Sequence, residues 1–294
     1  ATYLALYIAY YPRGFESGDN AYKIQQIKDL RQTGSTAVHY ALREIDPEHQ
    51  FYPAIYPFLI SSDSSYHLPF PFQLIHLYRP FFAAGGLPGI VALVLAAGLG
   101  ILFLGYLILA RLDQPSRGAP LLLVLALGSA LVPYAFSAYE HVITALALTG
   151  AAYFYLFSQV ARRELWAGLC LGLGVLIRAE LILMAPLLVG SRFLASGGKL
   201  RLKSDFLFAL STTILFLFFV GSNLFLTGHP FGFRGKAGFG WPVVPDALHR
   251  VLEYLFLRDE PHTTLVKATP AVAFSLLLLL RWRQAGEEFR TLFL

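Results

Sequence analysis

The feature that most constrains the fold is a pair of long apolar runs, LPGIVALVLAAGLGILFLGYLILA at 87–110 and FALSTTILFLFFVGSNLFLTG at 208–228. Each exceeds the roughly 20 residues that an α-helix needs to cross the hydrocarbon core of a bilayer. The composition agrees, because 56% of the residues are hydrophobic and 14% are charged, whereas soluble domains carry about a quarter charged residues. We therefore predict an all-α, polytopic integral membrane protein.

The positions of the basic residues predict how the chain crosses the membrane. They gather in four short segments between apolar runs, and such segments tend to face the cytoplasm. The segments hold Arg111 and Arg117; Arg162 and Arg163; Arg192, Lys199, Arg201 and Lys203; and Arg281, Arg283 and Arg290. A net charge of +5 spread in this way indicates topology and argues against nucleic acid as a partner. The lone Cys170 excludes an internal disulfide framework.

This alternation predicts one membrane domain over residues 1–294, with about 7–8 transmembrane helices. We expect 1–10 to be the outer half of a truncated first helix, 11–85 a first extracytoplasmic loop, 87–227 the next helices, 228–267 a second extracytoplasmic loop and 268–280 the last helix. Within 87–227 the expected spans include 119–137, 141–160 and 208–227. The apolar start and the basic end indicate a fragment of a longer chain.

The segment 166–191, WAGLCLGLGVLIRAELILMAPLLVGS, fits either one long helix or a hairpin of two short helices. A single crossing would move the Arg192–Lys203 cluster to the outside, so the positive-inside tendency favours the hairpin. The arms would then be only about 20 Å long, and the Arg-Ala-Glu turn would lie at membrane depth, facing protein or a wet cavity.

The first loop has the pattern of a structured region. In NAYKIQQIKDLRQTG, the residues Ala21, Ile24, Ile27 and Leu30 share one helical face, while Lys23, Gln26 and Lys28 lie elsewhere. Gly34 follows as a stop signal. The aromatic stretches FYPAIYPFLI (51–60) and FQLIHLYRPFF (72–82) fit segments that lie in the membrane interface.

Two acids, Glu16 and Asp19, follow the first apolar run in the stretch GFESGDN. Acids at this place fit a solvated loop, a helix cap or chemistry at the boundary between water and lipid. An Asp just before an amphipathic helix is a favoured N-cap. Catalysis and capping are compatible roles for Asp19.

Four further polar residues are candidates for substrate binding. Glu140 and His141 lie between two apolar runs, where they would orient an acceptor, bind a divalent cation or form an ordinary interfacial turn. No Cys/His cluster completes a metal site, so we assign no metal ligand. Arg178 and Glu180 lie inside an apolar segment, where ionisable residues are functional candidates by default. Arg178 would grip a phosphate with its planar fork, or the two would form a structural pair.

The second loop contains TGHPFGFRGKAGFGWP at 227–242, with His229, Arg234 and Lys236 set among glycines and aromatic residues. These residues would bind a lipid phosphate as a mobile cover, or serve as interfacial anchors. The spacing is not that of a P-loop.

Four stretches in this order, SGDNAYKIQQIKDL, DPEHQFYP, SAYEHVITALALTGAAYFYL and WAGLCLGLGVLIRAELILMAPLL, resemble the GT-C superfamily of polytopic membrane glycosyltransferases. The likeness is to bacterial proteins related to protein O-mannosyltransferases and aminoarabinose transferases, and it covers most of residues 10–190. It implies an acidic catalytic residue just after the first helix, which is Asp19 here, with Glu16 as the fallback. It also implies a bacterial inner-membrane enzyme that acts on the extracytoplasmic side.

The implied reaction moves a sugar from a polyprenyl-phosphate donor to an acceptor hydroxyl of a lipid, glycan or protein. A phosphate leaving group needs no general acid, unlike glycoside hydrolysis with its two carboxylates. One base at the headgroup level is then enough to take the hydroxyl proton. No organic cofactor is implied, and a divalent cation stays an open alternative.

Two other functions fit parts of the pattern. A membrane transporter would use Arg178 and Glu180 as a midplane site, but it would be expected to repeat its broken helices in matching places. A non-catalytic membrane scaffold would show the same hydrophobic pattern. No signature identifies the sugar or the acceptor.

Overall fold

The computed structural model describes residues 18–35, 37, 60–62, 65–68, 70–111, 134–195 and 201–233. All of them belong to the first of two compact units, Ala1–Gly238; the second is Phe239–Leu294. The predictions for 1–17, for the interfacial stretch 51–60 apart from Ile60, and for 119–133, 234–267 and 268–280 therefore lie outside the described residues.

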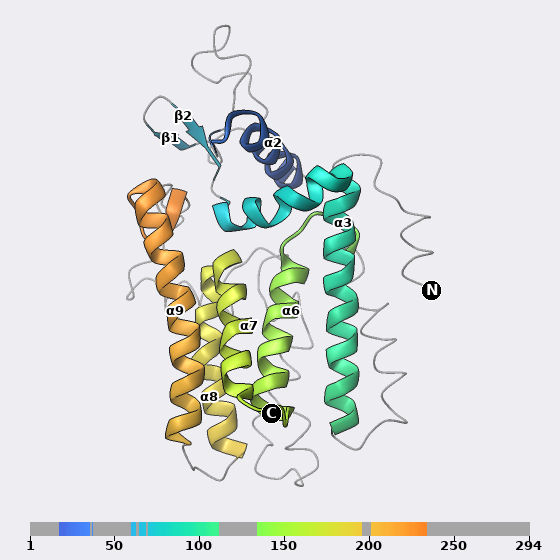
Figure 1. Ribbon diagram of the computed structural model, residues 1–294, viewed down its shortest axis with the longest axis vertical. Coiled ribbons are helices and arrows are strands. Elements are labelled where there is room, and N and C mark those ends of the chain that lie inside the picture. The colour runs from blue at the N-terminus through green and yellow to red at the C-terminus, as the bar shows by residue number, and fades with distance from the viewer. Residues whose placement is uncertain are drawn as a thin grey trace, which may run out of the picture. The chain divides into compact units, whose positions relative to one another are not determined.

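The described part is mostly helical, as the fold-class prediction expected (Figure 1). In chain order the elements are α2 (Gly18–Thr33), β1 (Ile60–Ser62), β2 (Ser65–His67), α3 (Phe72–Arg111), α6 (His141–Ala152), the π-helical turn η1 (Tyr153–Phe157), α7 (Arg163–Ile177), the 3-10 turn η2 (Ala179–Leu183), α8 (Met184–Ala195) and α9 (Leu202–Thr227). The two short strands pair antiparallel, with Ser61 opposite Tyr66. This small hairpin is where the described residues depart from an all-α fold.

Helix α3 is bent at Gly86, where φ is 62° and ψ is −146°. A glycine adopts this backbone conformation without the steric cost that a Cβ would add. Pro88 follows the bend and has no N–H to donate to the preceding turn. The predicted interfacial segment 72–82 and the predicted span 87–110 are thus the two arms of one bent helix. In Figure 1 the first arm lies across the direction of the second.

The helices pack in a chain of neighbours, α3 on α6, α6 on α7 and α7 on α9. Helix α2 packs on α3, and the two share a core with the start of α6 and the end of α7. Buried members of this core include Ile27, Ile75, Val142 and Ile177. A second core joins α6, η1, α7 and α9 through Ala151, Tyr155, Leu171 and Phe208. The cores place α2 beside the beginning of α6 and the end of α7.

Residues 166–191 form the hairpin that the charge pattern favoured. Helix α7 ends at Ile177, Arg178 is extended with φ −140°, and η2 leads into α8. The far ends of the two arms lie together: Nη2 of Arg192, near the end of α8, is 3.5 Å from Oε1 of Glu164, at the start of α7. The break comes within the Arg-Ala-Glu turn, as predicted.

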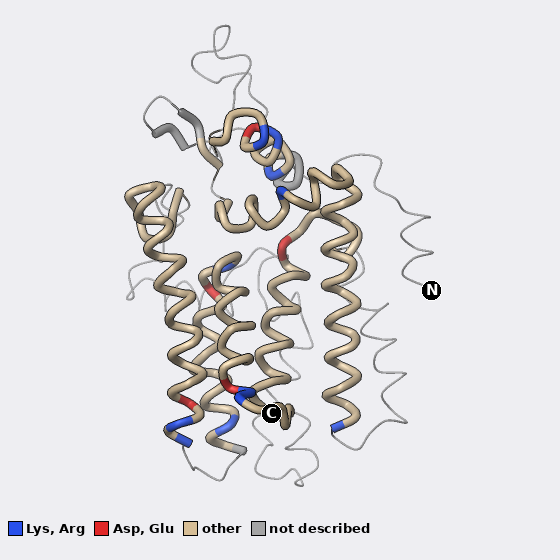
Figure 2. The backbone as a smooth tube through the Cα atoms, viewed as in Figure 1, with Lys and Arg blue, Asp and Glu red and all other residues tan. Residues whose placement is uncertain are grey.

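Among the described helices, two are long and apolar enough to cross a membrane, Phe72–Arg111 and Leu202–Thr227. The segment His141–Phe157 is a shorter apolar helix. Figure 2 shows most Lys, Arg, Asp and Glu residues near the two ends of the helices, with long stretches of other residues between them. This distribution is the one that an apolar layer between two polar layers would impose.

Candidate functional site

Of the two predicted catalytic acids, only Asp19 belongs to the described residues, and it lies at the start of α2. Glu16 is outside the described residues, whereas the backbone of Asp19 is helical. Because α2 begins at Gly18, Asp19 belongs to the first turn of the helix and does not precede it as the N-cap prediction expected. An acid in the first turn is favoured by the positive end of the helix dipole.

One turn further along α2, Lys23 forms an ion pair with Glu140. The distance from Lys23 Nζ to Glu140 Oε2 is 2.5 Å, and the side chains are 1% and 14% exposed. The two residues are 117 positions apart in the sequence. Glu140 is the residue that immediately precedes α6. The pair therefore ties the helix that carries Asp19 to the beginning of an apolar helix.

Aromatic rings enclose the Lys23 ammonium. Its Nζ lies 5.0 Å from the centre of the Phe70 ring and 5.2 Å from that of Tyr139. Cations are attracted to the faces of such rings, more strongly when they are shielded from water. Nearby, the Tyr78 hydroxyl donates to the carbonyl of Ala138 at 3.2 Å, which fixes the segment before Glu140 against α3.

The pKa of Glu140 is lowered from its ordinary value. Burial acts to raise this pKa, but the charge of Lys23 and its hydrogen bond to the carboxylate outweigh burial. Glu140 is therefore a carboxylate at neutral pH and balances the buried ammonium. Its lowered pKa makes it a poorer proton acceptor than an unpaired carboxyl would be.

His141, the other half of the predicted Glu-His pair, lies in an aromatic group with Tyr134 and Tyr139. Its ring stacks on Tyr134 at 5.2 Å with an interplanar angle of 6°, and it meets Tyr139 edge-on at 5.7 Å. The structure thus brings Asp19's helix, Glu140 and His141 to one end of the helices.

Arg178 is the residue at the break between α7 and η2, and Glu180 lies within η2. Arg178 Nε lies 4.0 Å from Glu180 Oε2, with side chains 32% and 41% exposed. Ile177, the neighbour of Arg178, belongs to the same core as Ile24 of α2. The predicted phosphate-gripping residue is therefore at the end of α7 that packs near α2.

The second loop is described only at its start. The backbone N–H of Phe231 donates to Nδ1 of His229 at 3.2 Å, and His229 N donates to the Thr227 hydroxyl at 3.2 Å. His229 thus shapes the turn after α9. Arg234 and Lys236 lie outside the described residues.

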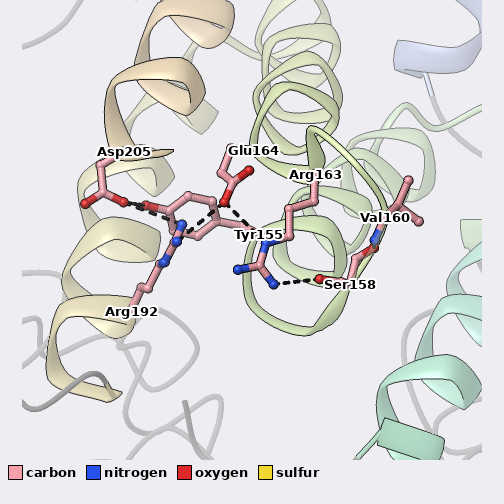
Figure 3. Close-up of polar contacts among 7 residues, drawn as sticks. All are labelled: Tyr155, Ser158, Val160, Arg163, Glu164, Arg192 and Asp205. Atoms are coloured by element: carbon pink, nitrogen blue, oxygen red, sulfur yellow. Dashed lines mark hydrogen bonds and ion pairs between the residues drawn. The ribbon is translucent and has the colours of Figure 1, made fainter. Parts of the chain in front are cut away.

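The sequence interpretation missed a polar network at the opposite ends of α7, α8 and α9 (Figure 3). Arg192 lies 3.5 Å from both Glu164 and Asp205, and its guanidinium stacks 4.7 Å from the centre of the Tyr155 ring. The Tyr155 hydroxyl donates to Asp205 at 2.5 Å. Arg163 donates to the carbonyl of Ser158 at 2.7 Å. The available signal was Arg192 at the end of an apolar segment, but the sequence analysis used this residue only to predict which side of the membrane the segment faces.

Comparison of the chain with family models, with curated proteins and with solved structures gives no match. The structure and the chemistry of its residues are therefore the basis for a proposed function.

Within the described ranges, no group of three or more His, Cys, Asp and Glu side chains is arranged to hold a metal ion. The candidate site consists of Asp19 on α2, the Lys23–Glu140 pair that joins α2 to the start of α6, the aromatic group around His141, and Arg178 at the end of α7. It combines a buried cation and a partly exposed arginine at the end of the apolar bundle where the backbone of Asp19 lies.

Proposed function

We propose that this chain is a membrane glycosyltransferase that moves a sugar from a polyprenyl-phosphate donor to an acceptor hydroxyl. The observation that carries the proposal is the position of Asp19, in the first turn of a helix that packs against one end of the apolar bundle. The phosphate of a lipid-linked sugar lies at the headgroup level of the membrane, and this end of the bundle would lie at the same level. About 7–8 spans with the site on the extracytoplasmic side fit the charge pattern. The bacterial inner membrane is what the resemblance to GT-C proteins implies.

The reaction needs one proton acceptor. The acceptor oxygen attacks the anomeric carbon, the bond from that carbon to the phosphate oxygen breaks, and polyprenyl phosphate leaves with the bonding electrons. The hydroxyl proton passes to the Asp19 carboxylate. Glu140 is less suited to this role because Lys23 already holds its carboxylate.

Arg178 is the described residue best suited to the donor phosphate. Its side chain is 32% exposed, and its partner Glu180 is 4.0 Å away, a loose contact. A guanidinium binds phosphate through two parallel N–H groups, which an ammonium does not reproduce. His229, Arg234 and Lys236 follow α9 and would add to the donor site as the cover proposed for the second loop.

The test is transfer by the purified full chain in detergent. Radiolabelled polyprenyl-phosphate mannose and polyprenyl-phosphate aminoarabinose serve as donors, and label is followed into lipid, glycan and protein fractions of bacterial membranes. Asp19→Asn keeps the shape of the side chain and removes the base, so transfer should fall by about 10²–10⁴-fold while the protein still folds. Glu16→Gln is the matched control and should lose far less.

Near-normal transfer by Asp19→Asn together with an inactive Glu16→Gln would move the base to Glu16. Normal transfer by both variants would remove these acids from the chemistry. Absence of transfer by the unmodified chain with both donors, accompanied by flux of a sugar in sealed vesicles, would favour a transporter.

A further inference from the structure

A buried lysine is an unexpected feature in α2. The hydrophobic face of α2 is formed by Ile24, Ile27 and Leu30, which are 2%, 0% and 2% exposed, as the sequence pattern predicts. Lys23 precedes this face and is nevertheless 1% exposed. Burying an ammonium is costly unless it is paired and hydrogen-bonded. The position of Lys23 therefore has to be explained by what it contacts.

The contacts of Lys23 come from two parts of the chain that are distant from α2 in the sequence. Glu140 precedes α6, Phe70 precedes α3, and Tyr139 adjoins Glu140. Apolar contacts alone define the rotation and height of α2 less sharply, since the hydrophobic effect is not directional. A short charge-assisted hydrogen bond is directional, because its energy falls steeply with distance and angle. The Lys23–Glu140 pair thus adds a directional restraint on the rotation and height of α2.

Asp19 lies four residues before Lys23, which is close to one turn of the helix. An α-helix is stiff over one turn, so fixing Lys23 also fixes the backbone of Asp19. A displacement of about 1 Å at a reacting group can lower the rate by about 10²-fold. Small shifts of α2 would therefore lower the rate of transfer without changing the overall fold.

Resting on the proposed function, we propose that Lys23 and Glu140 are positioning residues for the Asp19 base. On this assignment Glu140 does not bind the sugar or the phosphate. Its carboxylate serves the ammonium of Lys23, and the two together hold α2 in the register in which Asp19 meets the acceptor hydroxyl. We call this pair the α2 anchor.

The anchor predicts a split between catalytic rate and donor binding. In Glu140→Gln the shape is kept and the charge is lost, so kcat should fall by about 10- to 100-fold, with the KM for polyprenyl-phosphate sugar changed by less than about twofold. Lys28→Gln is the matched control. It removes a lysine from the same helix, but that lysine is exposed, so kcat should stay within about twofold of the unmodified chain.

Two double variants guard against simple misfolding. Lys23→Glu with Glu140→Lys reverses the pair and should recover at least tenfold of the kcat lost in either single variant. Lys23→Met with Glu140→Leu replaces the buried pair by apolar side chains, a change that proteins often tolerate without loss of stability. This apolar variant should fold and bind donor but transfer slowly, because the directional contact is missing.

A readout that is independent of transfer separates the anchor from the proposed function. Amide hydrogen exchange across residues 22–33 of α2 should speed up at least tenfold in Glu140→Gln and return toward the original rate in the reversed pair. If the unmodified chain transfers no sugar, the proposed function fails, and this measurement still decides whether the pair holds α2.

Three results would overturn the inference. The first is a large rise in donor KM in Glu140→Gln with unchanged kcat, which would make Glu140 a ligand of the donor. The second is full transfer by the apolar double variant. The third is unchanged hydrogen exchange of α2 in every variant.

Discussion

At the scale of single residues, the most informative difference between sequence and structure is the burial of polar side chains on α2. The helical pattern placed Lys23 and Gln26 away from the apolar face, yet they are 1% and 1% exposed, and Asp29 is 2% exposed. A periodicity reports which residues are apolar, not which polar residues will find partners. The partner of Lys23 is 117 positions away, so local sequence carries no signal for the pair.

Arg192 offers a test of the second polar network. Its side chain is 10% exposed and lies 3.5 Å from Glu164 and Asp205, carboxylates that are 12% and 16% exposed. Arg192→Met keeps most of the packing volume but leaves both carboxylates without their shared cation. We expect the free energy of unfolding to fall by about 3 kcal/mol, since breaking a buried ion pair typically costs this much. Unfolding in mixed micelles with increasing SDS measures the change.

Arg162→Met is the control for this prediction. Arg162 is exposed and precedes α7, so its loss should change the free energy of unfolding by about 0.5 kcal/mol or less. Equal effects of the two substitutions would show that the network contributes no more than a surface charge does.

At the scale of elements, the long apolar runs were predictable because length and hydropathy alone define them. The expected helices at 87–110, 141–160 and 208–227 correspond to the second arm of α3, to α6 with η1, and to α9 (Leu202–Thr227). Their ends were not predictable to the residue. The π-helical turn at Tyr153–Phe157 and the start of α9 at Leu202 depend on contacts such as that between Tyr155 and Asp205. Those contacts exist only after the helices have packed.

The contact between α7 and α9 depends on Gly168. A Cβ at this position would lie 2.6 Å from the carbonyl oxygen of Phe208 and 1.8 Å from the hydroxyl oxygen of Ser211. Gly168→Ala should therefore push the two helices apart and cost about 1–3 kcal/mol, as overpacked cores do. The midpoint of thermal unfolding in detergent should fall.

Gly221→Ala on α9 provides the matched control, because a Cβ there meets nothing within 4 Å. Alanine stabilises an open helical position by about 0.5–1 kcal/mol relative to glycine, so this variant should unfold at the same temperature or higher. A Gly168→Ala protein as stable as Gly221→Ala would contradict the close packing of α7 on α9.

At the scale of the whole described unit, the packed helices form a bundle whose charged residues gather at two distinct ends. One end holds α2, Glu140 and the break after Ile177. The other holds Glu164, Arg192 and Asp205. The positive-inside tendency predicted that the basic segments around Arg162 and Arg192 share a side, and the contact between α7 and α8 brings these segments together. Which end faces the cytoplasm is a matter of topology, and labelling tests it.

Cysteine labelling from outside intact cells addresses that orientation. In a Cys170→Ser background, Gln32→Cys places a thiol on the exposed end of α2, and Ala161→Cys places one in the exposed turn before α7. We expect a membrane-impermeant maleimide to label Gln32→Cys in intact cells and Ala161→Cys only after the membrane is opened, because basic segments are retained in the cytoplasm. The reverse pattern would put the Asp19 site in the cytoplasm and exclude an extracytoplasmic transferase. Labelling of both positions in intact cells would mean that the helices between them do not separate two compartments, and the apolar surface of α9 would then need a protein partner instead of lipid.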